Sequence, residues 1–160
     1  MEYRNSSYVI FNDDIYIYGG EKETHFVCIV KRTTNEEEIE VLHKLGFSNK
    51  HIDIYGDVYY NDRYACMVPK DKIESKFYVD TYTIFEGEEC TVTREEDGKI
   101  ELFISSYELA RKYKQDTYNG FYWKVNKSDL DIIWEELSET GDAPFPKGYP
   151  RKIVLYEKGK

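Results

Sequence analysis

The sequence predicts an α+β fold in which about three helices pack on one face of a mainly antiparallel, curved β-sheet. Many short segments alternate apolar and polar residues between turn residues, which is typical of strands with one buried face. Fewer segments combine a capping residue with apolar side chains at helical spacing. No internal repeat, linker or low-complexity stretch divides the 160 residues, so we expect a single domain spanning residues 1–160.

The first strands are expected close to the start of the chain. Residues 8–11 and 15–18 flank residues 12–14, where Asn and Asp accept the backbone geometry of a turn, so we predict a hairpin. Residues 25–31 are apolar on both faces, which favours a central strand.

The first helix is predicted to start at Thr34 or Asn35. Either side chain can cap a helix, and the three glutamates that follow favour the positive end of the helix dipole. Ile39, Leu42 and Leu45 lie on its apolar face, and Gly46 suits its C-terminal end.

Residues 51–60 alternate regularly, which predicts one strand with a buried face and an exposed face. The face expected to point to the core carries Ile52, Ile54, Val58 and Tyr60. The opposite, exposed face carries Asp53, Tyr55, Asp57 and Tyr59. A further strand is expected at residues 64–68, ending at Pro69.

A long strand is predicted at residues 76–85, because Phe77, Val79 and Phe85 fall on one face and polar or tyrosine residues on the other. Residues 90–94 and 99–104 are expected to follow as a hairpin. The dipeptide Asp97-Gly98 between them is the usual signal of a type I′ turn.

Two helices and two strands are expected in the remainder of the chain. Residues 105–108 match a capping box and open a short helix that ends near Lys114. Residues 121–125 and 152–156 are predicted strands. Between them, Ser128 is expected to cap the most regular helix, with Leu130, Ile133, Trp134 and Leu137 at helical spacing.

Acidic charge is the most informative feature of the composition. Aspartate and glutamate number 31 against 22 lysines and arginines, which gives a net charge of −9 and a pI near 4.9. Residues 1–110 carry a net charge of −11, and residues 111–160 carry +2. Such a field repels nucleic acid phosphates and steers basic proteins toward the surface. We therefore expect a basic protein partner and no nucleic acid.

No segment indicates membrane insertion or secretion. Mean hydropathy is −0.69, and the longest apolar run, residues 26–30, is far shorter than a membrane span. The first residues lack the basic and apolar pattern of a signal peptide. Cys28, Cys66 and Cys90 lie too far apart in sequence to indicate a disulfide framework. We therefore expect buried thiols in a reducing compartment, the cytoplasm.

The sequence contains no motif that indicates catalysis, a metal or a cofactor. His25, His43 and His51 lack the spacing of zinc ligands. The glycine-rich phosphate loops and the serine nucleophile motif are also missing from the sequence. We therefore predict no catalytic residue, no metal site and no bound cofactor.

Tyrosine-rich acidic segments are the best candidates for a functional surface. Tyrosine accounts for 16 of the 160 residues, and it is enriched at protein interfaces. Residues 53–64 read DIYGDVYYNDRY, and residues 78–82 repeat the alternation of phenol and carboxylate. Carboxylates bind Lys and Arg, and tyrosine rings add cation–π contacts. The predicted partner-binding residues are Asp53, Tyr55, Asp57, Tyr59, Asp62, Tyr64, Tyr78, Asp80 and Tyr82.

Residues 111–127 support a different hypothesis, a site for single-stranded nucleic acid. Basic residues there interleave with aromatic ones, and the combination can hold a strand by charge and stacking. The acidic charge of the whole chain disfavours this site. Moreover, Phe121 and Trp123 share a strand face that is predicted to be buried. The aromatic residues concerned are Tyr113, Tyr118, Phe121, Tyr122 and Trp123.

The stretches DIYGDVYYNDRY and TNEEEIE, in a chain without catalytic motifs, resemble the small acidic immunity proteins of bacterial toxin–immunity systems. The resemblance implies a binding protein, not an enzyme, that covers the basic active cleft of a nuclease-like toxin in a 1:1 complex. An inhibitor that mimics DNA would use the same acidic surface. The main alternative is a small enzyme or ligand-binding domain with a pocket between sheet and helices.

Overall fold

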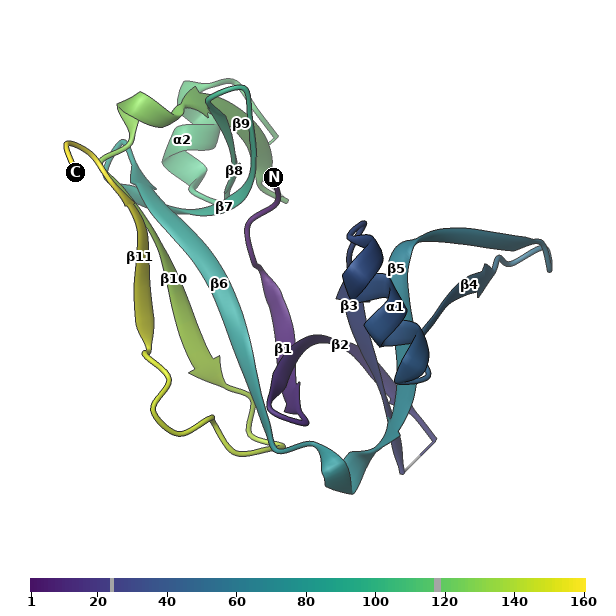
Figure 1. Ribbon diagram of the computed structural model, residues 1–160. Helices are drawn as coiled ribbons and strands as arrows, with labels where there is room; N and C mark the ends of the chain where they lie inside the picture. Colours follow the sequence, from purple (N-terminus) through teal and green to yellow (C-terminus); the bar gives the residue numbers. More distant parts are fainter. Residues whose placement is uncertain (24, 117–118) are drawn as a thin grey trace. The chain divides into compact units, whose positions relative to one another are not determined.

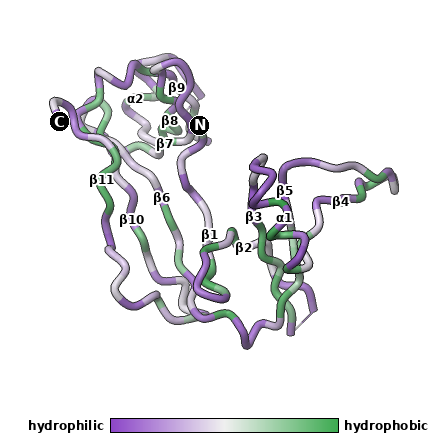
Figure 2. The backbone as a smooth tube through the Cα atoms, in the orientation of Figure 1, coloured by the Kyte–Doolittle hydropathy of each residue, from purple (hydrophilic) through white to green (hydrophobic). Residues whose placement is uncertain are grey.

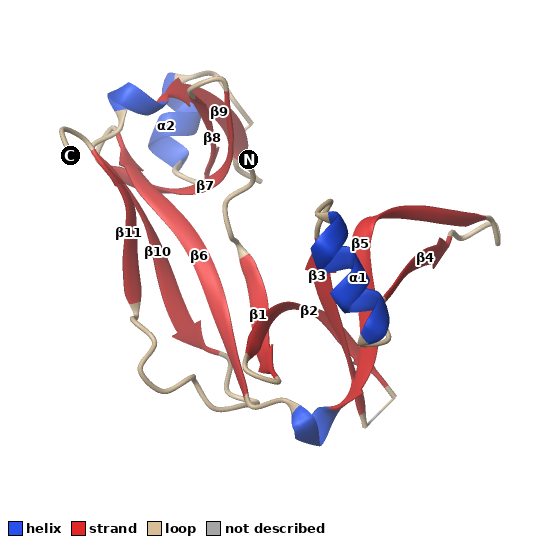
Figure 3. Cartoon of the chain, in the orientation of Figure 1, coloured by secondary structure: helices blue, strands red, loops and turns tan. Residues whose placement is uncertain are grey.

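The structure is a computed structural model that describes residues 1–23, 25–116 and 119–160. Strands account for 55% of the chain and helices for 13%. Figure 3 shows how strands dominate both parts of the fold. The described residues form eleven strands and two α-helices, so the predicted α+β fold with about three helices on one sheet face is wrong. The protein is instead mostly antiparallel β-sheet.

Two compact units make up the chain, each with its own hydrophobic core. Unit A consists of residues 7–77 and 140–146, and unit B consists of residues 1–6, 78–139 and 147–160. Figure 1 labels the elements of both units. That residues 1–160 form a single domain stays a prediction.

Unit A is built from five strands and one helix. In space its strands follow the order β4-β5-β3-β2-β1, and each neighbouring pair is antiparallel. The elements are β1 (Ser6–Phe11), β2 (Asp14–Lys22), β3 (Phe26–Arg32), α1 (Glu36–Lys44), β4 (Ser48–Ile52) and β5 (Val58–Pro69). The predicted first hairpin is confirmed. Asn12 and Asp13 form its two-residue turn with φ of 50° and 60°, as a type I′ turn requires.

The core of unit A lies between one face of its strands and α1. Of the two predicted candidates, Thr34 and Asn35, it is Asn35 that caps α1, because its side-chain oxygen accepts a hydrogen bond from the backbone N–H of Glu38 at 3.0 Å. Leu42 is the buried residue of this helix. The core contains Val9, Tyr16, Val27, Ile29, Leu42, Phe47, Tyr64 and Val68.

Unit B contains the remaining strands and the second helix. Its strands follow the order β6-β7-β8-β9, and β10 pairs with both β6 and β11. The elements are β6 (Ser75–Phe85), β7 (Glu88–Glu96), β8 (Lys99–Ile104), α2 (Tyr107–Lys112), β9 (Phe121–Asn126), β10 (Ile132–Glu139) and β11 (Lys152–Glu157). The predicted Asp97-Gly98 turn is confirmed, with φ of 51° and 73°. Ser106 caps α2 through the N–H of Leu109.

The predicted helix at residues 128–137 is wrong. Lys127–Asp129 form a single 3-10 turn, and the strand β10 follows. Ile133 and Leu137 are buried on one face of β10, while Trp134 on the other face packs on Tyr82 with ring centroids 6.0 Å apart. Because both faces of the strand are covered, its apolar residues acquire a spacing that imitates a helix.

The chain runs twice through an order of three strands, a helix and two strands, and β11 follows the second series. The last two strands of each series pair differently. In unit B, β9 pairs with β8 and β10 pairs with β6, so both strands join the main sheet. In unit A, β4 pairs only with β5 among the described strands. Residues 63–69 of β5 pair with β3, so only the outer part of the β4–β5 hairpin, residues 50–60, lies beyond the main sheet of unit A.

Candidate protein-interaction surface

The base of the β4–β5 hairpin is anchored in the core of unit A. Phe47, which connects α1 to β4, is 4% exposed and stacks on Tyr16 with ring centroids 5.4 Å apart. Tyr64 of β5 is 5% exposed, and its ring contacts His43 of α1. Both strands of the hairpin are therefore anchored in the core at the end that joins the sheet.

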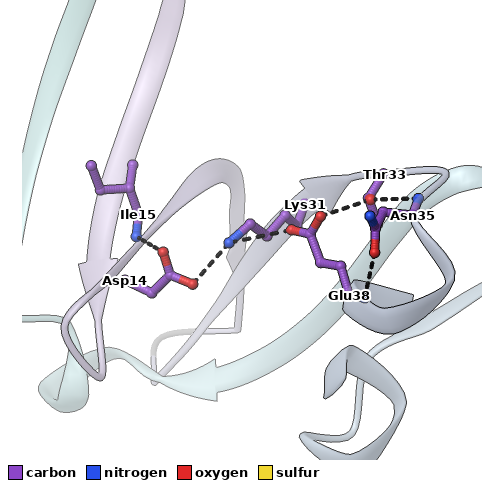
Figure 4. A network of polar contacts seen from close by, with 6 residues as sticks. All are labelled: Asp14, Ile15, Lys31, Thr33, Asn35 and Glu38. Atoms are coloured by element: carbon purple, nitrogen blue, oxygen red, sulfur yellow. Dashed lines mark hydrogen bonds and ion pairs between the residues drawn. The ribbon is translucent and has the colours of Figure 1, made fainter. Parts of the chain in front are cut away.

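A network of polar contacts fixes the start of α1 against β2 and β3 (Figure 4). Lys31 Nζ lies 2.8 Å from a carboxylate oxygen of Asp14 and 3.6 Å from one of Glu38. Glu38 also accepts a hydrogen bond from the hydroxyl of Thr33 at 2.8 Å. Partial burial raises the pKa of Asp14, but the hydrogen bonds from Lys31 and Ile15 outweigh it, so the pKa lies below its ordinary value.

The outer part of the hairpin extends beyond the main sheet. Residues 63–69 of β5 pair with β3, whereas residues 58–60 pair only with β4. Two side chains of β4 form hydrogen bonds with β5 where the outer arm meets the main sheet. The Asn49 amide donates to the carbonyl of Asn61, and the His51 ring Nε2–H donates to the carbonyl of Arg63, both at 2.9 Å. Figure 1 shows this two-stranded arm projecting from α1 and β3.

Asp53 shapes the turn at the end of the arm. One of its carboxylate oxygens accepts hydrogen bonds from the backbone N–H groups of Tyr55 and Asp57, at 2.8 and 2.9 Å. Its own backbone N–H donates to the carbonyl of Asp57 at 2.9 Å. Gly56 completes the turn with φ of 85°. The turn is therefore defined by hydrogen bonds that Asp53 makes from both its side chain and its backbone.

The outer arm exposes a run of large hydrophobic side chains. Figure 2 colours the backbone of both units by the hydropathy of each residue. Ile54 is 91% exposed and Tyr55 is 84% exposed, and the others are each at least 46% exposed. Among the described residues, six of the 17 exposed large hydrophobic side chains fall in this short stretch. We call them the hairpin tip: Ile52, Ile54, Tyr55, Val58, Tyr59 and Tyr60.

The expectation that Ile52, Ile54, Val58 and Tyr60 point to the core is wrong, because all four are at least half exposed. Residues 53–57 turn the chain back, so residues 51–60 form two strands and not one. Alternation in a sequence indicates which residues share a face, but it does not show that a face is covered. Here the arm extends beyond the main sheet and α1, so neither face of its outer part is covered by the core of unit A.

Most of the predicted partner-binding residues of this segment lie at the surface of the arm. Tyr55, Asp57, Tyr59 and Asp62 are exposed. Asp62 lies 3.9 Å from Arg32, which also has a half-exposed side chain. Asp53 is partly buried and shapes the turn, and Tyr64 belongs to the core. Neither of these two therefore contributes to the exposed surface as expected.

The other predicted residues, Tyr78, Asp80 and Tyr82, lie on β6 and belong to unit B. Tyr78 is 46% exposed, while Asp80 and Tyr82 are partly buried. Burial and the nearby carboxylate of Asp80 raise the pKa of Tyr82. The hairpin tip is thus defined within unit A alone, without these residues.

Four residues of the hairpin tip were missing from the predicted site, because the regular alternation assigned Ile52, Ile54, Val58 and Tyr60 to the core. A turn signal was available in the sequence. Gly56 sits between Asp53 and Asp57, and such a cluster favours a turn over a continuous strand.

The region of residues 111–127 does not present its aromatic rings as a stacking surface. Trp123 packs against Tyr113 with ring centroids 4.5 Å apart, and both contact the core of unit B. The Tyr113 hydroxyl donates to Glu86. Tyr122 is exposed, and Tyr118 lies outside the described residues. Two of the rings that would stack on bases are therefore engaged in packing.

Other chemistry has weak support in the part of the chain that the structure describes. No group of three or more His, Cys, Asp or Glu side chains there could hold a metal ion. Burial raises the pKa of the Cys90 thiol to about 11, which disfavours the reactive thiolate. A hollow of about 530 Å³ is lined by His25, Phe26, Pro69, Lys70 and Asp71, and no residue of α1 or α2 lines it. No helix among the described residues is long and apolar enough to cross a membrane.

The unit that carries the hairpin tip has a net negative charge, although Lys50 and Arg63 on the arm are basic. Unit A contains 14 acidic and nine basic residues, a net charge of −5. Asp57 and Asp62 lie on the arm itself, and Glu36, Glu37 and Glu40 are exposed on α1. The apolar tip therefore belongs to an acidic unit.

Comparison with known proteins places the chain in a family. A model of the family described as uncharacterised conserved protein UCP033725 matches residues 3–140, so the chain belongs to this family. The match includes the whole β4–β5 hairpin. No curated protein and no solved structure matches the chain.

Proposed function

We propose that this chain is a binding protein that engages a basic protein through the hairpin tip. The observation that carries the proposal is the exposed run of isoleucine, valine and tyrosine side chains on an arm that leaves the sheet. Single exposed hydrophobic side chains are normal, but a contiguous group of them marks an interaction site. Tyrosine is also among the residues that contribute most to binding energy at interfaces.

Folding alone gives no reason for these side chains. A two-stranded hairpin is at best marginally stable by itself, and an apolar residue that stays in water adds nothing to the core. The arm nevertheless has a defined turn and two side-chain hydrogen bonds at its junction. Such an arm presents its side chains in a fixed arrangement, which lowers the entropic cost of binding.

The charge of unit A favours a basic partner. Asp57 and Asp62 flank the tip and can meet Lys or Arg side chains, while the tyrosine rings can add cation–π contacts. The net charge of −9 steers a basic protein toward the molecule from a distance. Apolar contact at the tip and acidic charge around it together define the chemistry of the partner.

We extend the proposal to the consequence of binding. The resemblance to immunity proteins supports a role in which the chain neutralises a nuclease-like toxin by covering its basic active cleft in a 1:1 complex. An arm is suited to this task, because it can enter a concave site that a flat sheet face cannot reach.

Co-expression with the protein encoded by the adjacent gene, followed by native mass spectrometry, tests the proposal. We expect a 1:1 complex with a basic protein. The double variant Ile54→Ser, Tyr55→Ser should weaken it at least tenfold, because it removes the two most exposed side chains of the tip. The matched control is Tyr107→Ser, Tyr122→Ser, which removes two tyrosines of unit B that are 60% and 63% exposed. This control should bind as the unchanged protein does.

A complex that survives the tip variant but not the control variant would locate binding in unit B and refute the proposal. Equal loss in both variants would indicate nonspecific hydrophobic association. If a complex forms and the partner's enzymatic activity is unchanged within it, the proposed binding is supported and the proposed neutralisation is refuted.

A further inference from the structure

β4 is the last strand at one end of the strand order. It pairs with β5 on one side, and no other strand of the described chain lies along its opposite edge. The backbone N–H and C=O groups of such an edge can form a ladder with another chain. The edge belongs to the same arm that carries the hairpin tip.

The hydrogen-bond register shows which backbone groups of β4 point outward. Asp53 donates its backbone N–H to Asp57, so this pair is a hydrogen-bonded position of the hairpin. Hydrogen-bonded and non-hydrogen-bonded pairs alternate along an antiparallel ladder. The next pair, Ile52 with Val58, is therefore non-hydrogen-bonded, and both backbone groups of Ile52 point away from β5.

Lys50 lies two residues earlier in the same register, so its backbone N–H and carbonyl also point away from β5. Its backbone N–H donates to the hydroxyl of Ser48 at 3.1 Å, which leaves its carbonyl facing outward. The outer edge of β4 thus offers three backbone groups that can form hydrogen bonds with another strand. They are the carbonyl of Lys50 and the N–H and carbonyl of Ile52. An incoming antiparallel strand needs this arrangement.

The edge carries only part of the protection that proteins usually give to edge strands. β4 is short, contains Lys50 and has a register shift between Ser48 and Lys50, but it has no proline. Ile52 on this strand is 67% exposed. The stretch from Lys50 to Ile52, beyond the register shift, is regular and therefore remains open to strand pairing.

We propose that β4 accepts an extended segment of the basic partner as an added antiparallel strand. The inference rests on the proposed function and specifies how the hairpin tip recognises its partner. The segment carries apolar side chains at alternate positions, which continue the face formed by Ile52, Val58 and Tyr60. Its end next to the turn carries a basic residue, which lies close to the exposed Asp57.

Two substitutions at one position separate the backbone contribution from the side-chain contribution. Ile52→Ala and Ile52→Pro both remove the isoleucine side chain. Only Ile52→Pro also removes the backbone N–H that points outward. Because this N–H forms no hydrogen bond with β5, a proline is tolerated at this position of the edge strand. The probe is a fluorescein-labelled octapeptide, Arg-Arg followed by three Val-Thr pairs, and its control begins with Glu-Glu.

We expect saturable binding of the Arg-Arg peptide by fluorescence anisotropy and weaker binding of the Glu-Glu peptide. Ile52→Pro should bind about fivefold more weakly than Ile52→Ala, the effect of one hydrogen bond. In amide exchange measured by NMR, the peptide should protect the Ile52 N–H. Equal affinities of the two variants, or protection that maps to another strand, would overturn the inference.

The complex with the co-expressed protein distinguishes this inference from the proposed function. If the Ile54→Ser, Tyr55→Ser variant weakens that complex and Ile52→Pro and Ile52→Ala weaken it equally, the proposed function stands and strand addition fails. Loss in none of these variants refutes both. If sedimentation of the free protein reveals a dimer that Ile52→Pro dissociates, a second copy occupies the edge and the inference is overturned.

Discussion

At the scale of single residues, two aspartates of the same turn have different roles. Asp53 accepts two backbone hydrogen bonds and is partly buried, whereas Asp57 is exposed. The sequence predicts both as partner-binding residues, since composition and alternation treat them alike. The number of backbone N–H groups that a carboxylate accepts is a property of the folded turn, so only the structure separates them.

This difference predicts the outcome of three substitutions. Asp53→Ala should destabilise the turn, because two backbone N–H groups lose their acceptor. Each lost hydrogen bond costs about 1 kcal/mol of stability. Asp53→Asn keeps an acceptor oxygen and should preserve the turn, and Asp57→Asn should leave it unchanged. Amide hydrogen exchange of residues 50–60 measures the effect. Fast exchange in Asp53→Ala alone is expected, and an equal response to Asp57→Asn would contradict the assignment.

At the scale of elements, the sequence predicts well where a local signal determines the structure. The Asn12-Asp13 and Asp97-Gly98 turns and the Asn35 cap depend on nearest neighbours, and all three are confirmed. β10 and the β4–β5 hairpin depend on which faces are covered by segments far along the chain. Their apolar patterns therefore indicated a helix and a single buried strand, neither of which the structure contains.

Packing between β8 and the segment before β9 provides a prediction about an element. Gly120 has φ of 75°, and a Cβ there would lie 2.6 Å from the Phe103 ring and 2.9 Å from the carbonyl of Ile104. Gly98 has nearly the same φ of 73°, and a Cβ there would meet nothing within 4 Å. Both alanine variants carry the backbone cost of positive φ, about 1 kcal/mol. Gly120→Ala should lose about 1–3 kcal/mol more from overpacking.

Urea unfolding of the two variants measures this difference directly. Since their φ angles are nearly equal, the difference in unfolding free energy reports mainly the steric clash at Gly120. Equal free energies would mean that the Phe103 ring moves aside without cost.

At the scale of the whole molecule, the sequence establishes the sign and size of the charge but not its position relative to a surface. The exposed hairpin tip arises because the outer parts of β4 and β5 extend beyond the main sheet of unit A, while β9 and β10 pair with β8 and β6 in unit B. Both units share the order of three strands, a helix and two strands, although β11 follows in unit B, so the different fate of β4 and β9 comes from strand pairing. Strand pairing of that kind is the step that sequence patterns determine least.

The distribution of charge leads to a prediction about association kinetics with the co-expressed basic protein. Asp57→Lys, Asp62→Lys changes the net charge from −9 to −5 beside the hairpin tip. Glu96→Lys, Asp131→Lys makes the same change in net charge on exposed residues of unit B. If approach is steered toward the tip, the first variant should reduce the association rate at low salt by about tenfold. The second should reduce it much less.

Stopped-flow association at two ionic strengths provides the measurement. At about 0.15 M salt, the Debye length is about 8 Å, so the rates of all three proteins should converge as the long-range field is screened. Equal reductions in the two variants would mean that net charge alone, and not acidic residues beside the tip, guides the partner. An association rate of the unchanged protein that does not depend on salt would remove charge from the recognition mechanism and leave the apolar tip as its basis.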